Sequence, residues 1–122
     1  MALRDSMRNS AVPYLLPGEP VQAVIGAQTA SPYLAALTGA LAFLSLNRYR
    51  ILAVTPTRIL VLDAGKFSMK RARGVVMELA RSTQLGPGTG AWHRIPAGDE
   101  KLRVPRRFYK DIDAADAAGA AA

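Results

Sequence analysis

The chain contains no cysteine, a single histidine (His93) and fewer acidic than basic residues. Without cysteine it can form no disulfide bond, no thiolate nucleophile and no cysteine-ligated zinc or iron–sulfur site. His93 alone cannot build a metal site, and no serine or carboxylate stands at a spacing that predicts a nucleophile–base pair with it. We therefore expect a protein that is not an enzyme and that needs no metal or cofactor.

The N-terminal residues do not predict a secretory signal. Arg4 and Arg8 could imitate its basic region, but the apolar stretch at 11–16 is short, is interrupted by Pro13 and is closed by Pro17. We expect the bulk of the protein to lie in the cytoplasm.

The length and composition predict one folded domain. The chain has 122 residues, of which 50% are hydrophobic and 20% are charged, enough to bury a single core. We place the domain at residues 16–116, after an N-terminal arm at 1–15. The alanine-rich residues 117–122 have no large side chain to anchor them, so we expect a flexible tail.

Alternating apolar residues and turn signals predict a mainly β fold of the α+β class. The hairpin at 49–63 is the clearest, because two β-rich runs flank Thr55-Pro56-Thr57. Apolar residues at helical spacing from Arg106 onward predict a final helix that buries Phe108, Ile112 and Ala115. The predicted strands cover residues 21–29, 49–54, 58–63, 74–80, 91–95 and 101–104.

An uncharged run, SPYLAALTGALAFLSL, occupies residues 31–46 of this basic chain. Ser31 and Pro32 suit the start of a helix, and the leucines that follow recur at helical spacing. From Tyr33 to Leu46 such a helix would be about 21 Å long, against a hydrocarbon core of about 30 Å. A tilted or longer spanning helix would require that the first strand be abandoned. We therefore expect a short helical insert at about 31–47, between the first two strands.

This helix would be apolar on every side, so lipid or another protein chain should cover it. Small residues at a four-residue spacing would form a seam where a second helix packs closely. The seam comprises Ser31, Ala35 and Gly39, with Ala42 nearby. The residues expected to contact membrane or partner are Tyr33, Leu34, Leu37, Leu41, Phe43, Leu44 and Leu46.

Basic residues gather in the second half of the chain, where residues 66–110 hold eleven basic and three acidic side chains. Such a surface suits anionic lipid, although a solvated loop that keeps the protein soluble has the same composition. Nucleic acid is a rival partner, ranked lower because it leaves residues 31–46 unexplained. The residues predicted to bind an anionic surface are Arg48, Arg50, Lys66, Lys70, Arg71 and Arg73.

Three segments carry a family resemblance: LPGEPV at 16–21, the hairpin ILAVTPTRILVL at 51–62 and KLRVPRRF at 101–108. Together with the order of the predicted elements, they resemble the bacterial pleckstrin-homology-like (PH-like) domain. The resemblance implies a strongly bent antiparallel β-roll or barrel, plugged by the last helix, and a scaffold role. The insert at 31–46 departs from the family pattern.

The sequence thus predicts a non-catalytic, membrane-associated adaptor or scaffold at the inner face of the cell membrane. Its apolar helix and basic residues would engage anionic lipid or a membrane protein. Two alternatives stay open: a soluble homo-oligomer whose apolar helices pack together, and a basic nucleic-acid-binding domain. Light scattering without detergent separates the oligomer from the membrane-associated protein.

Overall fold

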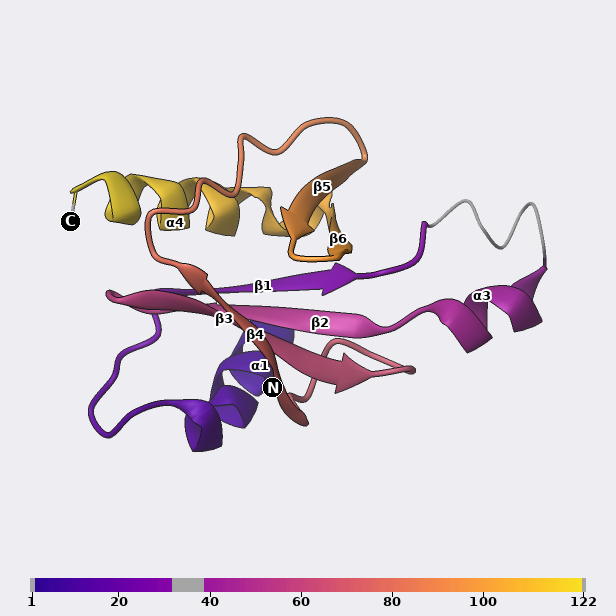
Figure 1. The fold of residues 1–122 in the computed structure, drawn as a ribbon, viewed down its shortest axis with the longest axis horizontal. Helices are drawn as coiled ribbons and strands as arrows, with labels where there is room; N and C mark the ends of the chain where they lie inside the picture. The colour runs from indigo at the N-terminus through magenta and orange to yellow at the C-terminus, as the bar shows by residue number, and fades with distance from the viewer. Residues whose placement is uncertain (1, 32–38, 122) are drawn as a thin grey trace.

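The computed structural model describes residues 2–31 and 39–121, which form one curled antiparallel sheet with flanking helices (Figure 1). The sheet is a half-barrel with the strand order β4-β3-β2-β1-β6-β5. Its strands are β1 (Ala23–Gln28), β2 (Tyr49–Val54), β3 (Arg58–Gly65), β4 (Gly74–Ala80), β5 (Trp92–Ala97) and β6 (Glu100–Pro105). The helices are α1 (Leu3–Ala11), α3 (Ala40–Leu46) and α4 (Tyr109–Ala121), with 3-10 turns at Val12–Tyr14 and Arg106–Phe108.

The core lies around the central strands, and the sequence explains why. Every residue of β1 is buried, as is all of β2 except Tyr49, so both faces of these apolar strands are covered. Phe108 and α4 residues Ile112 and Ala115 are at most 1% exposed, which confirms the predicted face of the final helix. The mainly β, antiparallel fold with a C-terminal helix is thus as predicted.

The turn between β2 and β3 follows from the side chain of Thr55. Its hydroxyl donates to the Arg58 carbonyl at 3.0 Å and accepts from the Arg58 N–H at 3.2 Å. Thr55 is fully buried, so these bonds satisfy a hydroxyl that water cannot reach. The predicted hairpin at 49–63 is confirmed, and the strands predicted at 91–95 and 101–104 also pair as a hairpin.

Helix α1 was not predicted, because residues 1–15 were expected to form an arm outside the domain. Met7 and Ala11 of α1 are fully buried and belong to the same core as the sheet. Arg4 donates to the Asp111 carboxylate at 2.8 and 3.0 Å, which ties α1 to α4. The N-terminal residues therefore belong to the folded unit.

The insert lies where it was predicted, between β1 and β2. These strands pair along their whole length, and Gln28 lies opposite Tyr49, so the two ends of the insert are neighbours. Helix α3 projects beyond the ends of both strands and does not fold back over the sheet (Figure 1).

The prediction of one continuous helix through residues 31–46 is wrong at Gly39. Gly39 has φ 93° and ψ 162°, outside helical geometry, and α3 begins at Ala40. Glycine tolerates this positive φ because it has no Cβ. Gly39 and Ala42 therefore do not share one helical seam with Ser31, while Ala35 of that seam lies outside the described residues, as do Tyr33, Leu34 and Leu37.

Candidate functional site

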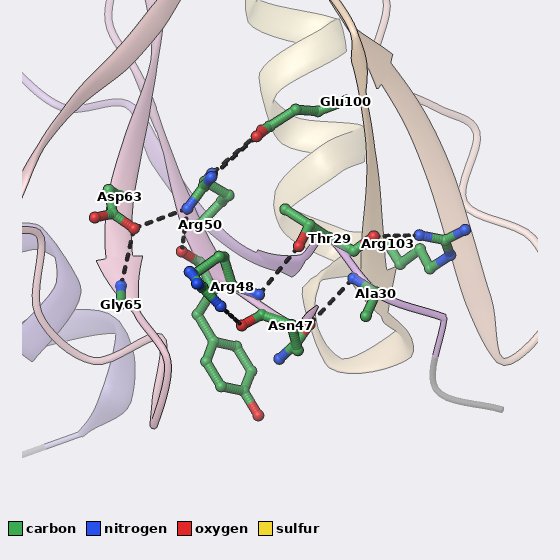
Figure 2. Close-up of polar contacts among 10 residues, drawn as sticks. Thr29, Ala30, Asn47, Arg48, Arg50, Asp63, Gly65, Glu100 and Arg103 are labelled. Carbon is green, nitrogen blue, oxygen red and sulfur yellow. Dashed lines mark hydrogen bonds and ion pairs between the residues drawn. The ribbon is translucent and has the colours of Figure 1, made fainter. Parts of the chain in front are cut away.

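The base of the insert is a set of hydrogen bonds between its two ends (Figure 2). The Thr29 N–H donates to the Arg48 carbonyl at 2.9 Å, and the Arg48 N–H donates to the Thr29 hydroxyl at 3.0 Å. The Ala30 N–H donates to the side-chain oxygen of Asn47 at 3.1 Å. From β6, the Arg103 guanidinium donates to the Thr29 carbonyl. The chain therefore leaves and re-enters the sheet at a fixed position.

Helix α3 carries large apolar side chains into solvent. Leu41 is 82% exposed and Leu46 is 63% exposed, whereas Ala42 and Phe43 are half-buried. Leu44 also lies on α3. A helix of seven residues without a side-chain cap gains little stability by itself. Its exposed leucines give this end of the molecule an apolar surface that the fold does not use.

A second exposed element, residues 66–73, lies beside the base of the insert and is called the basic loop below. It begins after Gly65, which pairs with Tyr49 at the start of β2. Phe67 is 85% exposed, while Met69 and Ala72 are buried. The chain thus turns two small or flexible apolar residues inward and one aromatic residue outward.

The buried residues of the basic loop fix its position against β1 and α1. Met69 packs against Gly26 so closely that a Cβ on this glycine would lie 2.2 Å from the Met69 sulfur. The Ala72 N–H donates to the Ser10 hydroxyl of α1 at 2.8 Å. These contacts anchor the loop against the domain, while Phe67 and its basic neighbours lie on the surface.

The basic residues predicted to bind an anionic surface fall into two sets: Arg48 and Arg50 at the base of the insert, and the cations of the basic loop. Arg50, predicted to meet an anionic surface, instead bonds the Asp63 and Glu100 carboxylates at 2.7 and 2.9 Å, and only 8% of the residue is exposed (Figure 2). Arg48 is half-buried and donates to the Asn47 carbonyl at 2.8 Å. Arg50 therefore joins β2, β3 and β6 and does not face a partner.

The four basic residues of the basic loop are exposed, and none forms an ion pair with another described residue. They are Lys66, Lys70, Arg71 and Arg73. Their charges are not neutralised by the fold, which leaves them available to an anionic partner.

Arg58 and Glu19 show how the fold uses its other charges. The Arg58 guanidinium bonds the Glu19 carboxylate at 2.8 and 3.0 Å, and the Leu16 N–H donates to Glu19 at 2.9 Å. The hydrogen bond from Arg58 is the main cause that lowers the pKa of Glu19 from 4.5 to about 2, although burial opposes it. The LPGEPV segment is therefore fastened to the start of β3.

Asp116 of α4 and His93 of β5 hold the segment at Leu85 and Gly86 in place. Asp116 accepts the N–H groups of Leu85 and Gly86 at 2.8 and 2.9 Å, and His93 Nε2 lies 2.7 Å from the Leu85 carbonyl oxygen. Within residues 2–31 and 39–121, no group of three histidine or acidic side chains is placed to hold a metal ion. These contacts account for His93 and Asp116 as parts of the fold.

The chain matches no protein-family model, no curated protein and no solved structure. No helix in the described part of the chain combines the length and the apolar character needed to cross a membrane.

The structure brings together two groups that the sequence could name only separately. Helix α3, which carries the exposed Leu41 and Leu46, lies at the end of the sheet where Tyr49 pairs with Gly65. Lys66 and Phe67 follow Gly65 directly in the chain. The sequence did not predict that Arg50 would be enclosed, because its partners lie 13 and 50 residues away. It also did not predict that α1 would pack beside the basic loop.

Proposed function

We propose that this protein is a PH-like, non-catalytic adaptor that docks on an anionic membrane surface at the inner face of the cell membrane. Helix α3 and Phe67 insert among the lipids, and the basic loop binds lipid phosphates. The curled antiparallel sheet with its C-terminal helix is consistent with a PH-like fold. The sheet acts as the scaffold that holds the docking elements at one end.

One observation carries this proposal: exposed apolar side chains occupy the same end of the molecule as basic side chains that form no ion pair with another described residue. Leu41, Leu46 and Phe67 are between 63% and 85% exposed. Complete burial of such a side chain contributes about 1.5–3 kcal/mol, and each lysine or arginine near an anionic surface contributes about 1 kcal/mol. Three inserted side chains and four cations are enough for reversible membrane association.

The charge at this end favours lipid over a second copy of the chain. A symmetric homo-oligomer that buried α3 would bring together the basic loops of two protomers, which carry the same charge. An anionic bilayer supplies both the apolar layer for α3 and the phosphates for the loop. The membrane therefore satisfies both features, whereas self-association satisfies only one.

Vesicle flotation of the full chain tests the proposal. We expect binding to vesicles of phosphatidylcholine with phosphatidylglycerol, weak binding to phosphatidylcholine alone, and a decline as salt rises. The double variant Lys66→Gln/Arg73→Gln should bind about tenfold more weakly. Its matched control, Arg106→Gln/Lys110→Gln, removes the same charge from exposed residues at and before the start of α4.

Two results would contradict the proposal. Equal binding to neutral and anionic vesicles would show that the basic loop plays no part in binding. Equal losses of vesicle binding in the two double variants would show that only the net charge of the protein matters, not the position of the basic loop. Light scattering without lipid should give a monomer. A stable oligomer in that experiment would support self-association through α3 instead.

A further inference from the structure

A pocket of about 490 Å³ lies between α1 and the basic loop. Its lining consists of Ser6, Asn9 and Ser10 from α1 and Lys70 and Arg71 from the loop. The three helix residues share one face because they lie three and four positions apart. The volume falls within the usual range of about 300–1,000 Å³ for small-ligand sites.

The pocket has a fixed wall. Ser10 donates to the Met7 carbonyl at 2.9 Å and accepts from the Ala72 N–H at 2.8 Å, so its hydroxyl joins the helix to the loop. Met7 and Ala72 are buried, which anchors both sides of this contact. The Ser6 hydroxyl makes no hydrogen bond with another described residue and is free to donate to a ligand.

The charge of the pocket is positive and unopposed. No carboxylate lines it, and neither Lys70 nor Arg71 forms an ion pair with another described residue. An arginine presents a planar fork that matches phosphate oxygens, and a lysine adds a compact second charge. Two cations beside a serine hydroxyl fit a small, doubly charged oxyanion.

We propose that this pocket binds a phosphomonoester dianion. A phosphodiester carries one negative charge and would leave one of the two cations uncompensated, whereas a phosphomonoester carries nearly two at neutral pH. The inference deepens the proposed function and rests on it only for the source of the ligand: the same loop faces the membrane, so the phosphomonoester is a lipid headgroup.

Amide chemical shifts measured by NMR on the full chain during titration with glycerol 3-phosphate at constant ionic strength test the pocket. We expect saturable shifts at Ser6, Asn9, Lys70 and Arg71, and none with glycerol. Lys70→Gln/Arg71→Gln should weaken the affinity about tenfold or more, and Ser6→Ala should weaken it less. Lys66→Gln/Arg73→Gln is the matched control, since it removes two charges from the same loop but none from the lining.

An equal loss in the two double variants, or no saturable shift at the lining residues, would overturn the pocket. Far-ultraviolet circular dichroism confirms that each variant is folded. Because Lys70 and Arg71 are exposed and form no ion pair with another described residue, their substitution leaves the core contacts of the loop intact.

Vesicles of equal surface charge identify the source of the ligand. Lipid binding predicts a preference for phosphatidic acid over phosphatidylglycerol, and predicts that Lys70→Gln/Arg71→Gln abolishes the preference. If glycerol 3-phosphate binds but no vesicle does, the pocket stands and the proposed membrane docking fails. If vesicles bind without preference and glycerol 3-phosphate does not bind, docking stands and the pocket fails.

Discussion

Helices α3 and α4 are both rich in apolar residues, but the fold uses them in opposite ways. The final helical segment buries Phe108, Ile112 and Ala115 completely or almost completely against the sheet. Helix α3 holds Leu41 and Leu46 in solvent at the end of a fixed base. The comparison separates apolar residues that stabilise the domain from apolar residues that remain available for a partner.

The basic residues divide in the same way. Arg4, Arg50 and Arg58 form ion pairs that join distant parts of the chain. The four cations of the basic loop form none with another described residue. Substitutions in the two classes should therefore change different measurements: stability for the buried and paired residues, and binding for the exposed and unpaired ones.

The largest expected loss of stability follows from truncation of Phe108. This side chain is fully buried against Gly26 of β1, so Phe108→Ala should lower the free energy of unfolding by about 3–5 kcal/mol. Urea unfolding followed by circular dichroism measures the change. A loss below about 1 kcal/mol would show that Phe108, in the 3-10 turn before α4, does not contribute to the core as described.

A smaller, pH-dependent loss is expected for Glu19→Gln, of about 2 kcal/mol at neutral pH, because the charge-assisted bonds to Arg58 disappear. The pKa of Glu19 is lowered from 4.5 to about 2, so its stabilising contribution is complete above pH 4.5 and is lost as the pH falls towards 2. Unfolding of both proteins across this range measures the difference. A difference that stays constant with pH would contradict the ion pair.

The next effect compares a paired arginine with an unpaired one. Arg50→Gln should cost about 1–2 kcal/mol, because the carboxylates of Asp63 and Glu100 lose their shared cation while staying partly solvated. Arg71→Gln, at an exposed position, should change the free energy of unfolding by less than about 0.5 kcal/mol. Equal losses in the two variants would erase the distinction between the two classes of basic residue.

The smallest change in stability is expected in α3. Leu41→Ala should alter the free energy of unfolding by less than about 0.5 kcal/mol, because Leu41 is 82% exposed and buries little against the domain. The same urea unfolding experiment used for Phe108→Ala measures it. A loss above about 2 kcal/mol would mean that the leucine is part of the core and not of a docking surface.

Local chemistry explains how much of the fold was predictable. Strands β2 and β4 begin and end at the predicted residues, since β-branched runs and turn residues mark both ends. Helix α1 was missed because it is mostly polar: its apolar positions are Leu3, Met7 and Ala11, and no side chain caps its N-terminus. Only the structure shows that these three apolar residues are enough to pack the helix against the core.

The candidate site was predictable in composition and not in geometry. The apolar α3 and the cations of the basic loop are visible in the sequence, but their common end of the sheet follows from the pairing of Tyr49 with Gly65. Gly39 resembles a tolerated helix glycine until its φ is known. From the sequence, Arg50 resembles an arginine that would contact lipid phosphates beside the apolar insert. Its ion pairs with Asp63 and Glu100, which are distant in the sequence, show that it stabilises the fold instead.

The most direct test of membrane docking is a fluorescence measurement at single labelled sites. The chain has no cysteine, so Leu41→Cys and Leu16→Cys each provide one attachment point for an environment-sensitive dye. Leu16 is the matched control because it is also exposed, at 61%, but precedes β1 at the opposite end of the sheet. We predict a blue shift and increased emission for the dye at residue 41 on addition of anionic vesicles, and no change at residue 16. No shift at residue 41, or equal shifts at both residues, would contradict docking through α3.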